Sequence, residues 1–396
     1  MPSKLTTDML SEELQKTEQA KTAQETDRRC PACNGVLAFD PASQKLKCPY
    51  CDSLYSFAEL EARASENHTE KAEKKTQPAQ AGPVNSSKLS EPRFRQSHIG
   101  AERPLNSEED SSNCNWGVKK KVVVCKKCGA STVYDAVQTA SQCPYCESNQ
   151  IIVEEDGKLI APTGIAPFKI TKEQAIDNFK NWVKGLWFAP GSLINLATVE
   201  MLEGFYLPFW TYDVHTVTKY SMDYGVKNGE RVTWHSTSGR HEQFFDDYLV
   251  PACAKQNRSM LEAISPFNTN DFQSYTPEFL AGFVAERYSI PVKEGWKTAD
   301  KEIRRDVRSS VKKIVCDQFS ADMTRREKFD IQMGDVGYKY LLLPVWHAAF
   351  RYHGSTYQFM VNGQNGKVFG DRPYSGWKIF FFVIACLFVL MCLVII

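Results

Sequence analysis

The sequence lacks the short motifs that mark several common catalytic sites. It has no GxxxxGK[ST] phosphate loop, no HExxH pair, no GxSxG nucleophile turn and no paired carboxylates in an apolar setting. The Gly363–Lys367 segment has the wrong spacing for a phosphate loop and predicts a hairpin turn. These absences argue against nucleotide hydrolysis, zinc-peptidase and serine-hydrolase chemistry, so we predict that the protein is not an enzyme.

The chain also lacks an excess of charge of either sign. Its 396 residues include 48 Lys and Arg and 47 Asp and Glu, a formal net charge of +1. Nothing in this balance attracts a polyanion over long range, so nucleic acid binding would need a local basic patch. Two basic patches exist: Lys119, Lys120, Lys121, Lys126 and Lys127, and then Arg304, Arg305, Arg308, Lys312 and Lys313. The second patch is interspersed with Asp300, Glu302 and Asp306, a mixture typical of an ordinary solvated helix face.

No apolar run follows the N-terminus, so the sequence predicts no secretory signal. Of the thirteen cysteines, eight form a repeated pattern and five are scattered: Cys114, Cys253, Cys316, Cys386 and Cys392. An odd, scattered set argues against a disulfide framework and for a reducing compartment.

The repeated pattern consists of two four-cysteine frames with one spacing. The first is Cys30, Cys33, Cys48 and Cys51, and the second is Cys125, Cys128, Cys143 and Cys146. Four thiolates at this spacing can surround one Zn²⁺ tetrahedrally, with each CxxC turn supplying two sulfurs. The alternative is two disulfides for each frame, but disulfide frames rarely repeat a single spacing. We therefore predict two structural zinc ions with no coordination position left open for water.

The last residues, 379–396, form an apolar run without a charge. As a helix the run would be about 27 Å long, close to the roughly 30 Å of hydrocarbon in a bilayer. Tyr374 and Trp377 precede the run, and Arg372 and Lys378 supply positive charge. A buried terminal element is the alternative. We predict a transmembrane tail anchor over 377–396, and a single-pass protein of the cytoplasmic membrane with its bulk in the cytoplasm.

The remaining composition predicts the domain organisation. Residues 1–27 are a polar arm, 28–57 the first zinc ribbon, 58–117 a disordered linker poor in apolar residues, and 118–153 the second ribbon. The body follows as two units, 160–292 and 293–373, because Leu207–Trp210 (LPFW) recurs as Leu343–Trp346 (LPVW). A helix with a capping box at Thr171 precedes the first copy, and a helix over about 294–319 precedes the second. We predict an α+β fold with a duplicated helix-plus-antiparallel-sheet body, two ribbons and one transmembrane helix.

Isolated residues with reactive side chains give weak predictions. His215, His347 and His353 fall on the polar faces of predicted strands, where solvated or locally hydrogen-bonded histidines are expected. Cys253 has no identifiable base partner, so we predict a buried, inert thiol.

Several segments together resemble a known family. They are the two CxxC…CPYC frames, APFKIT at 166–171, GFYLPFW at 204–210, LVPA at 249–252, YTPEFLAGFVAERY at 275–288, LPVW at 343–346 and VNGQNGKV at 361–368. In this respect the chain resembles bacterial TFIIB-type zinc-ribbon membrane proteins, the YdjG-like proteins. Members are often mislabelled as a primosomal helicase, but this sequence has no ATP-binding motif.

The resemblance implies a membrane-bound component of an assembly with PspA-like or flotillin-like (SPFH) protein partners. From the residues and the resemblance together we predict a non-catalytic, zinc-binding scaffold that recruits protein partners to the cytoplasmic face of the membrane. The alternative is a membrane-tethered protein that binds nucleic acid, or the transcription or replication machinery, through its ribbons.

Overall fold

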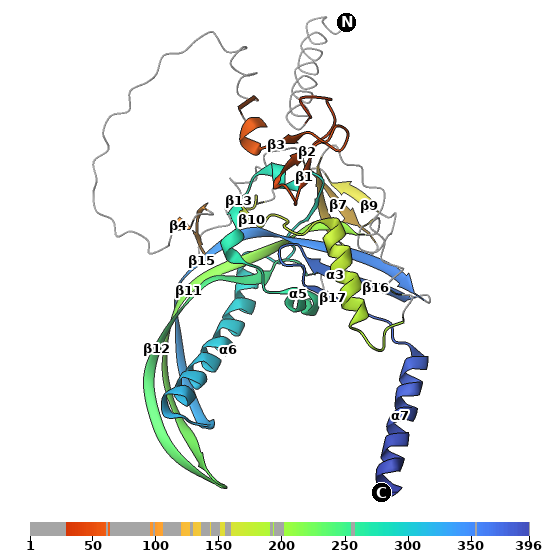
Figure 1. Ribbon diagram of the computed structural model, residues 1–396. Coiled ribbons are helices and arrows are strands. Elements are labelled where there is room, and N and C mark those ends of the chain that lie inside the picture. Colours follow the sequence, from red (N-terminus) through yellow and green to blue (C-terminus); the bar gives the residue numbers. More distant parts are fainter. Residues whose placement is uncertain are drawn as a thin grey trace, which may run out of the picture.

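The protein is built around one large mixed β-sheet (Figure 1). The computed structural model describes residues 29–60, 62–63, 96–97, 100–105, 120–126, 130–135, 143, 151–154, 160–190, 193, 202–254, 258–352 and 355–395. Within these ranges the long strands are β11 (Glu203–Asn228), β12 (Arg231–Pro251) and β15 (Met323–Tyr352), and the long helices are α3 (Lys172–Lys184), α6 (Val292–Phe319) and α7 (Gly376–Ile395).

The two copies of the repeated motif pair directly with each other. Strands β11 and β15 are antiparallel, with Leu207 opposite Leu343 at the point where the two motifs cross. β12 then pairs with β11, while β16 (Ser355–Asn362) pairs with β15. The outer parts of β11, β12 and β15 extend together as a curved three-stranded arm, which runs down one side of Figure 1.

The short strand that precedes each copy of the motif pairs with the long strand that carries the other copy. β10 (Gly164–Ile165) lies parallel to β15, and β14 (Val284–Glu286) lies parallel to β11. The indole N–H of Trp346 in the second motif donates to the carbonyl of Ile170, just before α3, at 2.9 Å. In the same way the indole N–H of Trp210 in the first motif donates to the carbonyl of Ile290, just before α6, at 2.8 Å. Each helix is therefore held by the strand of the opposite copy.

This exchange overturns the predicted fold class. The expected α+β architecture had two helix-plus-sheet units at 160–292 and 293–373, whereas the structure is mostly β-sheet, and both halves share one large mixed sheet. The prediction was wrong because a helix next to a strand in sequence was assigned to that strand. Helix α3 instead contacts β16 and β17, and α6 contacts β11 and β12 in addition to the following strand β15.

Local sequence signals place the two helices correctly. At the start of α3 the Thr171 hydroxyl accepts from the Gln174 N–H at 3.3 Å, and the Gln174 side chain accepts from the Thr171 N–H at 2.9 Å, which is the predicted capping box. Helix α6 buries one stripe at nearly every fourth residue: Val292, Gly295, Ala299, Ile303, Val307, Val311 and Val315. The apolar Ile314 of this helix lies outside the stripe and is exposed.

Gly295 lets the first turn of α6 approach β11 closely. A Cβ atom there would lie 2.5 Å from the Tyr212 hydroxyl and 2.9 Å from the ring of Trp210. The Tyr212 hydroxyl donates to the carbonyl of Val292 at 2.7 Å, so side chains of β11 hold the helix start in place. Further along the arm, the ring of Tyr224 stacks on Phe319 at 4.3 Å. Helix α6 therefore covers one face of the arm along its length.

The cysteine-bearing segments are joined to this body. Strands β1 (Ala38–Asp40), β2 (Lys45–Lys47) and β3 (Leu54–Tyr55) form a small antiparallel sheet in the first ribbon. The expected strands of the second ribbon are present as β7 (Lys120–Cys125) and β9 (Ile151–Glu154). With β8 (Ser131–Asp135) they extend the main sheet beyond β14.

The rest of the described chain forms short elements. They are β4 (Gln96–Ser97), β5 (Gly100–Ala101), β6 (Arg103–Pro104), α5 (Arg258–Ile264), the 3₁₀ turns Thr269–Asp271 and Pro277–Leu280, β13 (Gln273–Ser274) and β17 (Val368–Gly370). β6 falls within the predicted linker and pairs with β15. The NG-rich turn between β16 and β17 forms as predicted, with Gly366 at a φ of +75°.

The predicted transmembrane tail anchor is wrong. Among the residues that the structure describes, no helix has both the length and the apolar character that crossing a membrane requires. The same finding overturns the predicted single-pass topology and the assignment to the cytoplasmic membrane, which depended on that segment. The apolar run does form a helix, α7, whose first turns contact the body. The Lys378 ammonium donates to the carbonyl of Ala189 at 2.8 Å, and the ring of Phe382 meets Phe188 at 5.3 Å.

Candidate functional site

The first cysteine frame is built from two CxxC turns with the same backbone geometry. In the first turn the N–H of Asn34 donates to the carbonyl of Cys30 at 2.8 Å, and in the second the N–H of Asp52 donates to the carbonyl of Cys48 at 2.9 Å. Asn34 and Asp52 both have positive φ values, 62° and 57°. Asn and Asp tolerate this conformation better than most residues. Each turn thereby directs two sulfurs toward one point.

The four sulfurs of this frame gather into one cluster. The Sγ atoms of Cys30, Cys33, Cys48 and Cys51 all lie within 4.8 Å of one another. Cys30 and Cys51 are 3.5 Å apart and Cys33 and Cys48 are 3.4 Å apart, far longer than the roughly 2.05 Å of a disulfide bond. The frame is therefore not disulfide-bonded, and its thiols are close enough together to hold a metal ion.

The protonation of these thiols is strongly coupled. Burial raises the pKa of Cys30, but hydrogen bonds from the backbone N–H groups of Cys33 and Ala32 outweigh burial and bring it to about 6. The backbone N–H of Gly35 lowers the pKa of Cys33, but the neighbouring sulfurs of Cys48 and Cys51 outweigh it and bring it to about 12. Neighbouring sulfurs therefore compete for protons, which is the situation that a divalent cation relieves.

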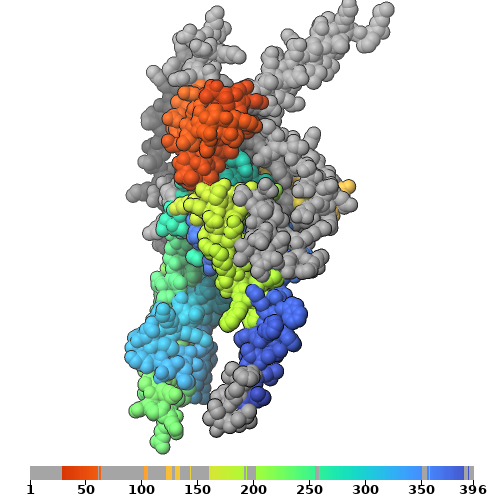
Figure 2. All heavy atoms as spheres, turned by 45° about the vertical axis from the view of Figure 1, so that its right-hand side comes forward, coloured from red at the N-terminus to blue at the C-terminus, as the bar shows by residue number. Residues whose placement is uncertain are grey.

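Aromatic side chains hold this ribbon against the body. The Phe39 ring lies 5.3 Å from Phe279, and Phe57 lies 4.9 Å from the same ring. The N–H of Phe39 donates to the carbonyl of Ala281 at 2.9 Å, and the Gln44 amide donates to the carbonyl of Phe168 at 2.7 Å. Figure 2 shows the first ribbon (red) seated directly on the body. The ribbon that carries the four thiols is thus packed against the protein core.

The second frame lies only partly within the described residues. Cys125 and Cys143 are buried, while Cys128 and Cys146 lie outside the described part of the chain. The N–H of Cys125 donates to the carbonyl of Ala130 at 2.9 Å, and the N–H of Cys30 makes the equivalent bond to Gly35 at 2.7 Å. The two bonds therefore join equivalent positions of the two frames.

Among the other reactive residues considered from the sequence, those that the structure describes do not join the thiol cluster. His215 is half exposed and lies 3.6 Å from Glu242, in agreement with a solvated position. His347 is instead buried against Phe205, and burial lowers its pKa to about 4. Its predicted position on a polar, solvated face is therefore wrong, whereas its hydrogen bond with Gln358 fits the locally hydrogen-bonded alternative. Cys253 is buried as expected, and His353 lies outside the described residues.

A second polar cluster, which the sequence did not predict, is formed by buried side chains of β11, β12 and β15 and of the segment before β6. The Lys339 ammonium, in a side chain 1% exposed, lies 3.0 Å from Asp213, 2.9 Å from Asp247 and 3.5 Å from Glu102. The Asp247 N–H donates to the Asp213 carboxylate at 2.6 Å, where a β-bulge gives Asp247 a φ of +51°. In sequence Asp213 alternates with the apolar Trp210, Tyr212 and Val214, a pattern that predicts a solvent-facing carboxylate, so only the fold reveals its burial.

The charges in this cluster do not balance. Three carboxylates surround one ammonium, so one carboxyl group keeps its proton most easily. Burial, together with the neighbouring Asp213, raises the pKa of Glu102 to about 8. Burial also raises the pKa of Asp247, and for Lys339 the attraction of Asp213 and Asp247 outweighs burial and raises the pKa. A pKa of about 8 keeps the Glu102 carboxyl largely protonated at neutral pH, which lowers the negative charge around Lys339.

A pH dependence of stability follows. The pKa of Glu102 rises from an ordinary value of 4.5 to about 8 on folding, so the folded state binds a proton that the unfolded state has lost. The stabilisation is complete below pH 4.5 and is lost as pH rises through about 8. We expect Glu102→Gln to flatten this part of the profile, measured by urea unfolding across that pH range. Glu294→Gln, at an exposed position, serves as control. If the unfolding free energies of both variants depend on pH in the same way, the assignment of this pH dependence to Glu102 is contradicted.

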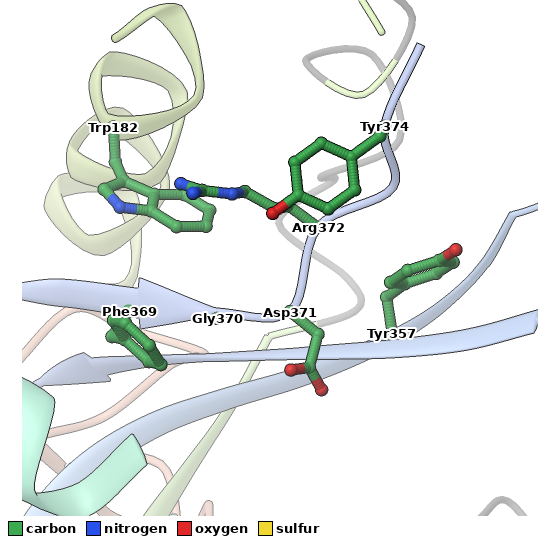
Figure 3. Close-up of a pocket in the computed structure, with 7 residues that line it drawn as sticks. All are labelled: Trp182, Tyr357, Phe369, Gly370, Asp371, Arg372 and Tyr374. Atoms are coloured by element: carbon green, nitrogen blue, oxygen red, sulfur yellow. The ribbon is translucent and has the colours of Figure 1, made fainter. Parts of the chain in front are cut away.

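An aromatic pocket of about 500 Å³ lies between α3 and β17. It is lined by Trp182, Tyr357, Phe369, Gly370, Asp371, Arg372 and Tyr374 (Figure 3). The Arg372 guanidinium is 5.7 Å from the centre of the Tyr374 ring, and Figure 3 shows it extending between this ring and Trp182. The lining thus combines four aromatic rings with one acidic residue, Asp371, and one basic residue, Arg372.

Comparison with known proteins gives one distant similarity. The chain is 28% identical over 228 residues to an uncharacterized protein, YdjG, of Bacillus subtilis strain 168. The match covers 56% of this chain and 66% of that protein, slightly less than two thirds of its length. No family model matches the chain. No solved structure matches it either. This similarity supports a relationship to YdjG but does not show that the chain belongs to the TFIIB-type zinc-ribbon family.

Proposed function

We propose that this protein is a non-catalytic, zinc-binding scaffold that brings protein partners together, and that it is a distant YdjG-like zinc-ribbon protein. The observation that carries the proposal is the four-thiol cluster of Cys30, Cys33, Cys48 and Cys51. A tetrahedral Zn²⁺ with ligands at about 2.3 Å holds its sulfurs about 3.8 Å apart, a separation that the four Sγ atoms can adopt with small shifts. Four protein sulfurs would leave no position for a substrate or water, so the metal would be structural.

The second frame supports a second ion. Cys125 begins a turn with the same N–H to carbonyl bond that Cys30 makes, and Cys143 is buried as Cys48 is. Cys128 and Cys146 would complete this site at the matching positions of the sequence. The expected content is two zinc ions in each chain.

The long arm supports the scaffold part of the proposal. β12 forms one outer edge of a three-stranded surface, and polar side chains cover the face away from α6, among them Lys219, Arg240 and Lys328. Extended strands of this kind offer side chains and backbone groups over a large area, as protein-binding surfaces do. The resemblance to YdjG-like proteins nominates PspA-like and flotillin-like proteins as the first partners to test.

The test combines metal analysis with partner capture. Elemental analysis of the purified full chain is expected to give two zinc ions. Affinity capture of the tagged full chain, with nuclease present, is expected to retain a protein partner in stoichiometric amount. The same capture with Cys33→Ser/Cys51→Ser should lose the partner if the ribbon contributes to binding. A chain that contains no zinc, or that retains only nucleic acid when nuclease is omitted, would contradict the proposal.

A further inference from the structure

Helix α6 carries a stripe of basic side chains on the face opposite its buried stripe. The stripe consists of Lys297, Lys301, Arg305, Arg308 and Lys312, spaced by four, four, three and four residues. With Arg258 of α5 these side chains line a groove of about 850 Å³, in which Glu302 is the one acidic lining residue. Figure 2 shows the light-blue atoms of α6 at the molecular surface.

The protein itself already engages the acidic residues of α6, and one of them, Asp306, lies 3.4 Å from Arg305 of the stripe. Asp300 pairs with Arg304 at 3.0 Å, and Arg304 also donates to the carbonyl of Ile331 on the arm. Asp306 accepts from the hydroxyl of Tyr248 on β12 at 3.1 Å. Glu302 pairs with Arg258. The acids that made this helix look like a mixed solvated face are therefore engaged by the protein itself, and the groove keeps an excess of positive charge.

Two of the basic side chains that line the groove already pair with carboxylates from outside its lining. Arg258 pairs with Glu262 at 2.8 Å, and Lys312 pairs with Glu327 of β15 at 2.5 Å. Lys297 and Lys301 have no acidic partner among the residues that the structure describes, and the Arg305 side chain, 3.4 Å from Asp306, is 73% exposed. The middle of the stripe is therefore a row of cations open to an incoming ligand.

We propose that this groove binds an acidic segment of a partner protein. The inference rests on the proposed function, because it specifies the chemistry of the partner that the scaffold recruits. Four residues of a helix advance it by about 6 Å. Acidic side chains at every fourth position of a partner helix would match the basic stripe, and so would those at every second position of an extended segment, which are about 6.6 Å apart.

The lining of the groove favours a protein over a nucleic acid strand. Nucleic-acid-binding grooves combine cations with aromatic rings on which bases stack, and none of the nine lining residues is aromatic. Carboxylates already pair with Arg258 and Lys312 in the groove lining, so its cations suit carboxylate ligands. The net charge of +1 also gives no long-range attraction for a polyanion.

The test measures binding of a fluorescent probe peptide to the full chain by anisotropy. The probe is an alanine-based helical peptide with Glu at every fourth position, and its control has Gln at those positions. We expect the Glu peptide to bind and the Gln peptide not to bind. Lys301→Glu/Arg305→Glu is expected to weaken binding about tenfold, equivalent to about 1.4 kcal/mol. The matched control is Lys293→Glu/Lys313→Glu, which makes the same charge change on exposed positions of α6 outside the groove and should change affinity less than about twofold.

Three outcomes would overturn the groove proposal: no binding of the Glu peptide, equal weakening by both double variants, or tighter binding of an oligothymidylate that the groove variant abolishes. Circular dichroism and zinc content of both variants establish that they are folded.

Failure of the groove proposal is distinguishable from failure of the scaffold proposal. If Lys301→Glu/Arg305→Glu still captures the zinc-dependent partner, the scaffold function stands and the groove is not its binding surface.

Discussion

Replacing Cys33 and Cys51 with serine is expected to abolish metal binding at the first frame and to unfold residues 29–60. A ribbon of this size buries too little apolar surface to fold without its metal, so the binding free energy of the ion is also its folding free energy. Zinc content should fall from two ions to one, and proteolysis should cleave within the ribbon. Chelation of the unmodified protein should reproduce the cleavage.

The body is expected to remain folded but to lose stability. Phe39 belongs to the hydrophobic core and packs on Phe279, so release of the ribbon exposes rings that the body now buries. The loss of one buried phenylalanine ring costs about 3–5 kcal/mol. The control is Cys316→Ser, which changes a partly exposed cysteine of α6 outside both frames. An intact ribbon in the double variant, or an equal effect of the control, would contradict the metal site.

Lys339→Met is expected to destabilise the protein by about 3–5 kcal/mol, because it leaves buried carboxylates without a counter-charge. The Asp213 side chain is 3% exposed and that of Asp247 is 12% exposed, so water cannot replace the lost ammonium. Urea unfolding monitored by tryptophan fluorescence measures the change. Lys328→Met, at an exposed position of the same strand, is the matched control and should change stability by less than about 1 kcal/mol.

Neutralising the stranded acids should restore part of the loss. Lys339→Met combined with Asp213→Asn and Asp247→Asn removes the unpaired charges and keeps the side-chain volumes similar, and breaking one partner costs more than removing all of them. We expect the triple variant to be more stable than Lys339→Met alone. If the added substitutions instead destabilise the protein further, the lysine acts through packing and not through its charge.

Features that depend on neighbouring residues could be predicted from the sequence. The capping box at Thr171, the turns after Asn362 and the apolar stripe of α6 each involve positions within a few residues of one another, so local hydrogen bonding and periodicity determine them. The first cysteine frame belongs to the same group, because two CxxC turns joined by a short hairpin bring four sulfurs together.

Features that depend on distant segments could not be predicted. The alternation of β11 correctly placed Trp210, Tyr212 and Val214 on the buried face, yet it placed Asp213 in solvent. Asp213 is buried because Lys339 and Glu102 arrive from distant parts of the chain, and no local pattern records their approach. The predicted solvated position of His347 is wrong for the same reason, because Phe205 of β11 packs against it.

The sequence by itself determined where α3 and α6 begin, which of their faces is apolar and where the first four sulfurs gather, because each depends on short-range geometry. Only the tertiary structure decided which strands those helices cover. Trp346 holds the start of α3 and Trp210 holds the start of α6, so each copy of the repeat completes the other in a single sheet. The apolar pattern of a helix does not specify which copy of the motif it packs against. The antiparallel pairing of β11 with β15 specifies it, because this pairing brings the tryptophan of each copy to the helix that precedes the other copy.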